Sequence, residues 1–301
     1  MKIPRPALVL SVLLAALAAN LPARAAPPAR IVPSADGTPI SYEVHGSGEP
    51  TLVFIHGWNC DSRYFREQIP FFSASQRVVA VDLAGHGHSG SSRSNHTMES
   101  FGHDVQAVLR DLDGGPFVLL GHSMGGIVAA HAARIDRSRI LGLVAIDTLE
   151  SVEFPLSREQ YLAMTAPFAS DFPSACRAFV QTMLVPATPA PLREWILSDM
   201  ASAPPAVAMQ AMHDMLSLYV DAKIAPLFDD LPLPVVGVYA DLWPVDAEAN
   251  RRHMQSFEAI VLPGTDHFLQ LAVPSDFNPA LQKALALLPG VLPVASPEAE
   301  R

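Results

Sequence analysis

The sequence predicts an α/β fold built on a mostly parallel, doubly wound sheet with an inserted helical cap. Short, continuous apolar runs recur along the chain, as is typical of strands that are covered on both faces. Stretches with helical spacing separate these runs, as a parallel sheet requires. The alternation stops between about residues 149 and 230, where helical propensity and six methionines replace it, and it then resumes. This interruption predicts the cap.

The expected elements follow the chain in order. The Asp36-Gly37 pair is a turn signal between two extended stretches and predicts a hairpin over residues 31–46. Apolar strands are expected at residues 51–55, 77–81, 117–120, 140–146, 234–240 and 258–262. Helices are expected at residues 62–72, 98–112, 127–135 and 279–288.

The N-terminus has the pattern of an export signal. Lys2 and Arg5 precede an apolar run over residues 7–17, and Ala23-Arg24-Ala25 matches an A-x-A cleavage pattern. The apolar run is short for a membrane span, so no stable membrane anchor is expected. We therefore expect a signal peptide and a periplasmic or secreted protein. The expected division of the chain is a signal peptide (1–25), a core (26–148 and 231–290), a helical cap (149–230) and a loose tail (291–301).

Composition narrows the class of protein. Of the 301 residues, 50% are hydrophobic, which suffices for a substantial core. The formal net charge of −10 argues against a nucleic-acid partner, because phosphate binding needs clustered Lys and Arg. Cys60 and Cys176 could form a disulfide after export or remain as two buried thiols. Neither cysteine has ligand spacing for zinc, and no acidic residue has suitable spacing to join the histidines in a metal cluster, so no metal is expected.

The motif Gly121-His122-Ser123-Met124-Gly125 is a G-x-S-x-G. An apolar strand precedes it and a helix follows it, which is the context that a nucleophile elbow requires. A sharp strand-to-helix turn lifts the serine oxygen above the sheet edge, and it needs small residues two positions away on each side. Ser123 is therefore the candidate nucleophile.

With two further motifs, the sequence resembles the α/β-hydrolase superfamily, in its large group of esterases, lipases and perhydrolases. His56-Gly57-Trp58 follows the strand over residues 51–55. The stretch over residues 82–89 looks like the D-x-x-G-x-G-x-S turn of that superfamily. The similarity of pattern extends over most of residues 31–288. It implies the α/β-hydrolase fold and chemistry that requires no cofactor.

Ester hydrolysis passes through an oxyanion, which two backbone N–H groups can stabilise. One donor is expected to be the residue after the nucleophile, Met124. The resemblance implies that the other is the backbone N–H of Trp58, where Gly57 allows a close approach of the chain.

The triad of this fold runs in the order Ser, acid, His. Three histidines follow Ser123 beyond its own helix. His213 precedes the strand that should carry the acid, and His253 lies in a charged helical stretch, whereas His267 follows the last strand. His267 is therefore the expected general base.

The acid has three candidates. Asp241 directly follows the strand over residues 234–240, and the resemblance favours it, although its loop is one residue shorter than in many relatives. Asp246 lies five residues further on. Asp147 follows the preceding strand, where some lipases carry their acid. The expected triad is Ser123, Asp241 and His267.

The leading functional hypothesis is hydrolysis of small or medium apolar carboxylic esters through an acyl-enzyme. A lactonase, a carbon–carbon bond hydrolase or a perhydrolase could use the same triad. A non-catalytic ligand receptor on the same fold is the alternative from another class. Haloalkane dehalogenases and epoxide hydrolases carry Asp at the elbow, and Ser123 argues against both.

Overall fold

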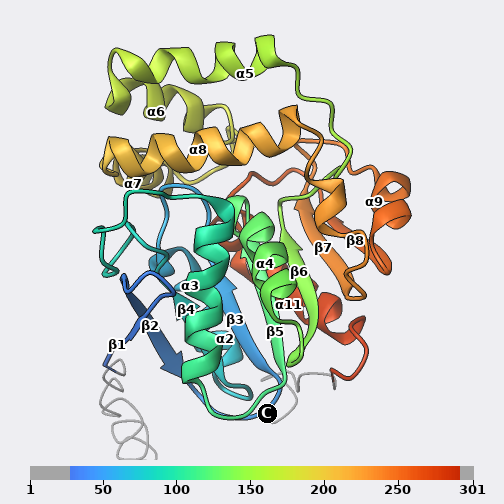
Figure 1. Cartoon of the computed structure of the whole chain (residues 1–301). Helices are drawn as coiled ribbons and strands as arrows, with labels where there is room; N and C mark the ends of the chain where they lie inside the picture. Colours follow the sequence, from blue (N-terminus) through green and yellow to red (C-terminus); the bar gives the residue numbers. More distant parts are fainter. Residues whose placement is uncertain (1–27, 292–301) are drawn as a thin grey trace, which may run out of the picture.

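The computed structural model describes residues 28–291. The expected signal peptide, and the expected tail from residue 292 onward, lie outside this range. The described chain forms an eight-stranded sheet between helices, with further helices above one edge (Figure 1).

The sheet has the strand order β1-β2-β4-β3-β5-β6-β7-β8. The first two strands form the expected hairpin, and β2 is antiparallel to β4; all later pairs are parallel. The strand bounds are β1 Arg30–Pro33, β2 Pro39–His45, β3 Thr51–Ile55, β4 Val78–Val81, β5 Phe117–His122, β6 Ile140–Ile146, β7 Pro234–Ala240 and β8 Ser256–Leu262.

The apolar runs form the centre of the sheet because both of its faces are covered. Every residue of β3, β4, β5 and β7 is buried. Val53 and Ile55 belong to one hydrophobic core, and Leu52 and Phe54 belong to a second. This split follows from the alternation of side chains along a strand.

Helices cover both faces. Those with four or more residues are α2 Gln68–Phe72, α3 Met98–Asp111, α4 Met124–Ile135, α5 Arg158–Thr165, α6 Phe172–Gln181, α7 Ala190–Ala201, α8 Pro205–Val220, α9 Ala247–His253, α10 Leu269–Ala272 and α11 Pro274–Ala286, with the 3-10 turns η1 Ser62–Phe65 and η2 Ala166–Ala169. Residues of α3 and α4 pack in the first core, and residues of α2 and α11 pack in the second.

The expected helix over residues 62–72 is divided into η1 and α2. Pro70 has no N–H, and its ring clashes with the carbonyl of the residue four positions earlier in a helix. A continuous helix through Arg66 is therefore disfavoured, whereas Pro70 is tolerated in the first turn of α2, which begins at Gln68.

Helices α5 to α8 connect β6 to β7 and lie above the carboxyl edge of the sheet (Figure 1). Their buried side chains are continuous with the first core, where Trp58 packs edge-on against Phe168 and Phe179. Cys60 and Cys176 are both buried and free, so no disulfide joins them.

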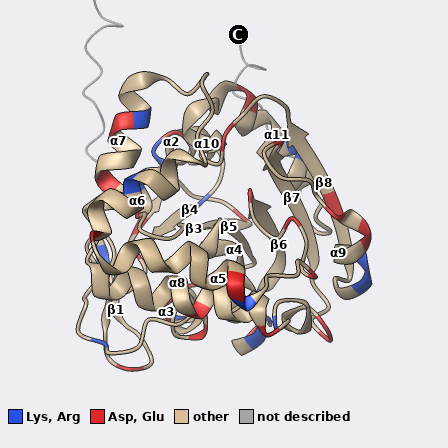
Figure 2. Cartoon of the chain, turned by 90° about the horizontal axis from the view of Figure 1, so that it is seen from above, with Lys and Arg blue, Asp and Glu red and all other residues tan. Residues whose placement is uncertain are grey.

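Seen from above, Lys and Arg are interspersed with Asp and Glu over the outer elements (Figure 2). Among the helices of residues 28–291, none is both long and apolar enough to cross a membrane.

Candidate active site

Ser123 occupies a strained turn between β5 and α4. Its backbone has φ 53° and ψ −124°, a conformation that L-residues rarely adopt. A Cβ on Gly121 would lie 2.3 Å from the carbonyl oxygen of Gly125. A Cβ on Gly125 would lie 2.3 Å from the carbonyl oxygen of Ile55 in β3. Both glycines are therefore required by the close approach of backbone at the turn.

His267 lies in the loop after β8 and is held from three sides. Its Nδ1 is 2.6 Å from Oδ2 of Asp147. Its backbone N–H donates to the carbonyl of Met183, which lies between α6 and α7 in the cap. Its own carbonyl lies 2.8 Å from Nε2 of His122. The ring is buried, and its position depends on the core and the cap together.

The prediction that Asp241 is the partner of His267 is wrong in this structure. Asp241 is exposed, and its carboxylate accepts a hydrogen bond from the backbone N–H of Gly264 at 2.8 Å. Asp246 caps α9 by accepting from the N–H of Ala249. The third candidate, Asp147, is buried beside His267.

Asp147 directly follows β6 and is fixed by hydrogen bonds to the neighbouring strand β7. Its backbone N–H donates to the carbonyl of Val238, and its Oδ1 accepts from the N–H of Ala240 at 2.7 Å. Its backbone φ is +44°, which turns the chain sharply after β6. A strand-end position was the only sequence signal for Asp147, and Asp241 shares it.

The loop after β3 orients the expected oxyanion donor. The carbonyl of Gly57 accepts from the N–H of Cys60 at 3.2 Å and lies 2.8 Å from Nδ1 of His56. Nε2 of His56 accepts from the N–H of Leu83, so Nδ1 carries the proton and donates to Gly57. In a trans peptide the C=O and the following N–H point in opposite directions. The N–H of Trp58 therefore points away from these two donors.

Met124 is the first residue of α4, where backbone N–H groups have no partner within the helix. Within residues 28–291, neither the N–H of Met124 nor that of Trp58 donates a hydrogen bond to a protein acceptor. Both N–H groups can therefore act as donors to a bound oxyanion.

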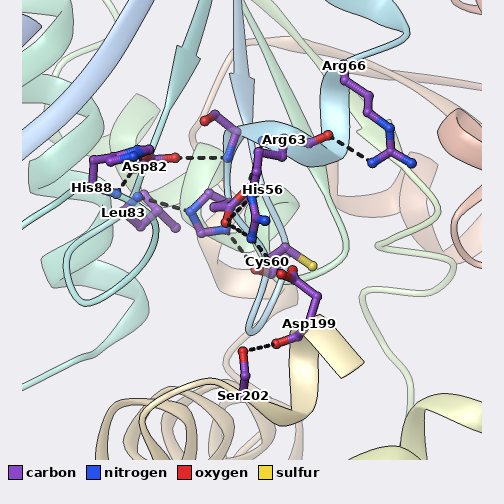
Figure 3. Close-up of polar contacts among 12 residues, drawn as sticks. His56, Cys60, Arg63, Arg66, Asp82, Leu83, His88, Asp199 and Ser202 are labelled. Carbon is purple, nitrogen blue, oxygen red and sulfur yellow. Dashed lines mark hydrogen bonds and ion pairs between the residues drawn. The ribbon is translucent and has the colours of Figure 1, made fainter. Parts of the chain in front are cut away.

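A polar network holds this loop in place and joins it to the cap (Figure 3). The carboxylate of Asp82 accepts from the N–H groups of Ser62 and His88. The guanidinium of Arg63 donates to Asp61 in the loop and to Asp199 in α7, both at 2.6 Å. The turn over residues 82–89 thus has a structural role.

The apolar cavity between core and cap has a volume of about 50 Å³. Ser123 and His267 both line it, together with Gly57, Trp58, Cys60, His122, Phe179, Met183, Met200, Met212, Met215 and Phe268. The lining contains no Asp, Glu, Lys or Arg, which favours an uncharged ligand.

Burial lowers the pKa of two further histidines, which favours their neutral form, and raises the pKa of one carboxyl group. Burial lowers the pKa of His56 and lowers that of His122 well below its usual range. Burial, together with the charge of nearby Asp147, raises the pKa of Glu150 to about 7. Burial also raises the pKa of the Cys60 thiol well above its usual range, so Cys60 is not a ready nucleophile.

The described part of the chain contains no group of three or more His, Cys, Asp or Glu residues placed to hold a metal ion. The chemistry that the site can perform with its own residues is attack by a serine, assisted by a buried imidazole–carboxylate pair.

A family model described as alpha/beta hydrolase fold matches residues 50–223. The chain therefore belongs to the α/β-hydrolase family, and its relatives indicate a hydrolase. It is 27% identical over 248 residues to a pimeloyl-[acyl-carrier protein] methyl ester esterase of Edwardsiella ictaluri. The alignment covers 78% of this chain and 93% of that protein. It is also 37% identical over 125 residues to a non-heme chloroperoxidase of Streptomyces lividans. That alignment covers 40% of this chain and 45% of the chloroperoxidase.

Solved structures agree on the fold. A thermophilic esterase from Thermogutta terrifontis superposes with a TM-score of 0.72 at 25% identity, over 86% of this chain and 98% of that one. A bromoperoxidase from Bacillus anthracis superposes with a TM-score of 0.76 at 19% identity, over 86% of this chain and all of that one. The α/β-hydrolase fold with a mostly parallel sheet, predicted from the sequence, is thereby confirmed.

Proposed function

We propose that this protein is a serine hydrolase that cleaves carboxylic esters through an acyl-enzyme, with Ser123, His267 and Asp147 as its triad. The observation that carries the proposal is the buried His267–Asp147 pair in the same apolar cavity as Ser123 at a strained elbow. An isolated helix-capping serine would need neither the strain nor the buried pair.

The hydrogen bond to Asp147 fixes the tautomer of His267. A carboxylate only accepts, so Nδ1 carries the proton and Nε2 is left with a lone pair. Nε2 can then accept the proton of the Ser123 hydroxyl. Asp147 orients the imidazole and stabilises the imidazolium that forms.

In acylation, Oγ of Ser123 bonds to the ester carbon, and the N–H groups of Trp58 and Met124 stabilise the resulting oxyanion. The carbon–oxygen bond to the alcohol then breaks, and His267 returns the proton to the leaving oxygen. In deacylation, a water molecule repeats these steps in place of the alcohol and releases the acid. No cofactor takes part.

The similarity to a pimeloyl-[acyl-carrier protein] methyl ester esterase supports ester chemistry, since that relative aligns over most of both chains. The experiment is hydrolysis of p-nitrophenyl esters from acetate to palmitate by residues 26–301, beside Ser123→Ala. We expect turnover that falls by at least about 10⁴-fold in the variant. Folded protein that reacts with a fluorophosphonate at Ser123 but cleaves no ester would contradict the esterase proposal and favour lactone, carbon–carbon or peracid chemistry.

We also propose export to the periplasm or the medium, on the basis of the N-terminal sequence pattern. Mass spectrometry of the protein recovered from the producing cells tests this, with cleavage after Ala25 as the expected result. An intact N-terminus on cytoplasmic protein would contradict it.

A further inference from the structure

The cap segment between α6 and α7 contacts the loop that carries His267. The carbonyl of Met183 accepts from the backbone N–H of His267 at 3.1 Å. The hydroxyl of Thr188 donates to Oδ2 of Asp266, the residue directly before His267. Thr188 and Asp266 are both buried. The cap therefore holds the histidine loop by a backbone contact and by a side-chain contact.

The carboxylate of Asp266 restrains the backbone around His267. Its Oδ1 accepts from the N–H of Phe268 at 2.8 Å, so the side chain connects the residue before the general base to the residue after it. Its Oδ2 is the atom that accepts from Thr188. A displacement of this carboxylate would therefore move the backbone on both sides of His267.

Asp266 depends on these two donors. Within residues 28–291, its side chain accepts from Thr188 and Phe268 and forms no ion pair. Burial raises the pKa of this carboxyl, and the hydrogen bonds from Thr188 and Phe268 oppose that rise. Loss of the Thr188 hydroxyl would leave a buried carboxylate short of a donor, which costs free energy and favours a shift of the loop.

The cap segment is itself held in a fixed shape. The N–H of Thr188 donates to the carbonyl of Val185 at 3.0 Å. The guanidinium of Arg193 in α7 donates to the same carbonyl at 2.6 Å. Leu184 is buried in the first core. A segment that is fixed in this way can set the position of His267.

We propose that Thr188 and Asp266 are positioning residues that hold His267 in place beside Ser123, so that the cap completes the catalytic site as well as lining its cavity. This inference rests on the proposed function and deepens it. Thr188 does not line the cavity, so it acts through the histidine loop and not on the substrate.

The experiment compares two substitutions of Thr188 on p-nitrophenyl acetate. Thr188→Val removes the hydroxyl and keeps the shape, whereas Thr188→Ser keeps the hydroxyl. Rates are divided by the concentration of sites that a fluorophosphonate labels at completion, so unfolded protein does not contribute. We expect Thr188→Val to lower kcat about tenfold and to change KM less than about threefold, because a small displacement of a catalytic group suffices for such a loss. Thr188→Ser should stay within about twofold of the wild type.

Two control variants test whether any loosening of the cap has the same effect. Asp214 in α8 accepts from the N–H of Met98 in α3 at 2.7 Å, a contact between cap and core outside the histidine loop. Thr182 is exposed, and its hydroxyl donates to the carbonyl of Phe179 within the cap. Asp214→Ala and Thr182→Val should both keep kcat within about twofold of the wild type.

Asp266→Asn decides the question if Thr188→Val does not fold. It keeps the shape of the side chain and removes the charge of a buried carboxylate, so the free energy of unfolding should not fall. A hydrogen bond between Thr188 and a neutral group is weaker, so kcat should fall about fivefold. Activity and stability would then change independently, which a merely structural contact does not predict.

A loss of kcat in Thr188→Val that Asp214→Ala shares would overturn the inference, since the hydrogen bond would then only fasten the cap. An equal loss in Thr188→Ser, or unchanged kcat in Asp266→Asn, would contradict it as well. Unchanged kcat in Thr188→Val beside an active wild type would remove the inference alone. If the wild type cleaves no ester, or Ser123→Ala cleaves as fast as the wild type, the proposed function itself fails and the inference fails with it.

Discussion

The acid of the candidate triad gives the sharpest prediction at the scale of single residues. Asp147→Asn keeps the shape of the side chain but removes the charge that fixes the tautomer of His267. We expect kcat to fall by about 10²–10⁴-fold, measured on p-nitrophenyl acetate. Asp241→Asn is the matched variant and should retain activity within a few fold, since within residues 28–291 Asp241 accepts only from the N–H of Gly264. A larger loss in Asp241→Asn than in Asp147→Asn would return the acid to Asp241.

Glu150 gives a prediction about pH. Burial and the nearby charge of Asp147 raise its pKa from 4.5 to about 7, so the folded state binds this proton more tightly than the unfolded state does. Between about pH 4.5 and 7 stability is therefore lost as the pH rises. Above pH 7 the charged carboxyl costs about 1–3 kcal/mol.

Glu150→Gln should therefore raise the free energy of unfolding relative to the wild type at pH 8 by about 1–3 kcal/mol, and by little at pH 4.5. Urea unfolding at the two pH values checks this. Glu49→Gln, an exposed position in the loop between β2 and β3, is the control and should change neither value. The same difference at both pH values would show that the charge of Glu150 is not the cause.

At the scale of elements, the elbow between β5 and α4 tolerates no side chain at its glycines. In Gly125→Ala the new Cβ would lie 2.3 Å from the carbonyl oxygen of Ile55, which is backbone of β3 and cannot move without disturbing the sheet. We expect a loss of about 3 kcal/mol or more in the free energy of unfolding, and loss of fluorophosphonate labelling at Ser123.

Gly37→Ala is the matched control for the elbow. Gly37 has φ +84°, but a Cβ there meets nothing within 4 Å, so only backbone strain of about 1–2 kcal/mol is expected. Gly125 has no positive φ, so a loss no larger than that of Gly37→Ala would mean that the contact with Ile55 is relieved at little cost.

At the scale of the whole molecule, the cap is joined to the core beside the site. Nε1 of Trp58 donates to the carbonyl of Ala208 in α8 at 2.7 Å. Trp58→Phe keeps the backbone N–H and most of the ring but loses this hydrogen bond. We expect about 1 kcal/mol of lost stability and faster proteolysis within α7 and α8. Unchanged proteolysis would show that the Arg63–Asp199 pair and apolar packing suffice to hold the cap.

The sheet and the elbow could both be predicted from local patterns in the sequence. Continuous apolar strands, alternation with helices and a G-x-S-x-G at a strand end are local patterns, and local backbone sterics and burial decide their outcome. The division of residues 62–72 into two short helices also had a local cause, Pro70, although the pattern of apolar residues concealed it.

Which carboxylate contacts His267 depends on how distant segments pack together. Asp147 and Asp241 each follow a buried strand, and β6 and β7 are neighbours in the sheet. Ile146 pairs with Val238, so Asp147 lies level with Tyr239, whereas Asp241 lies two residues further along the neighbouring segment. The backbone at Asp147 turns its carboxylate inward to Ala240 and His267, whereas Asp241 turns outward to Gly264. That difference depends on contacts between segments about 100 residues apart in the chain, and no local pattern records it.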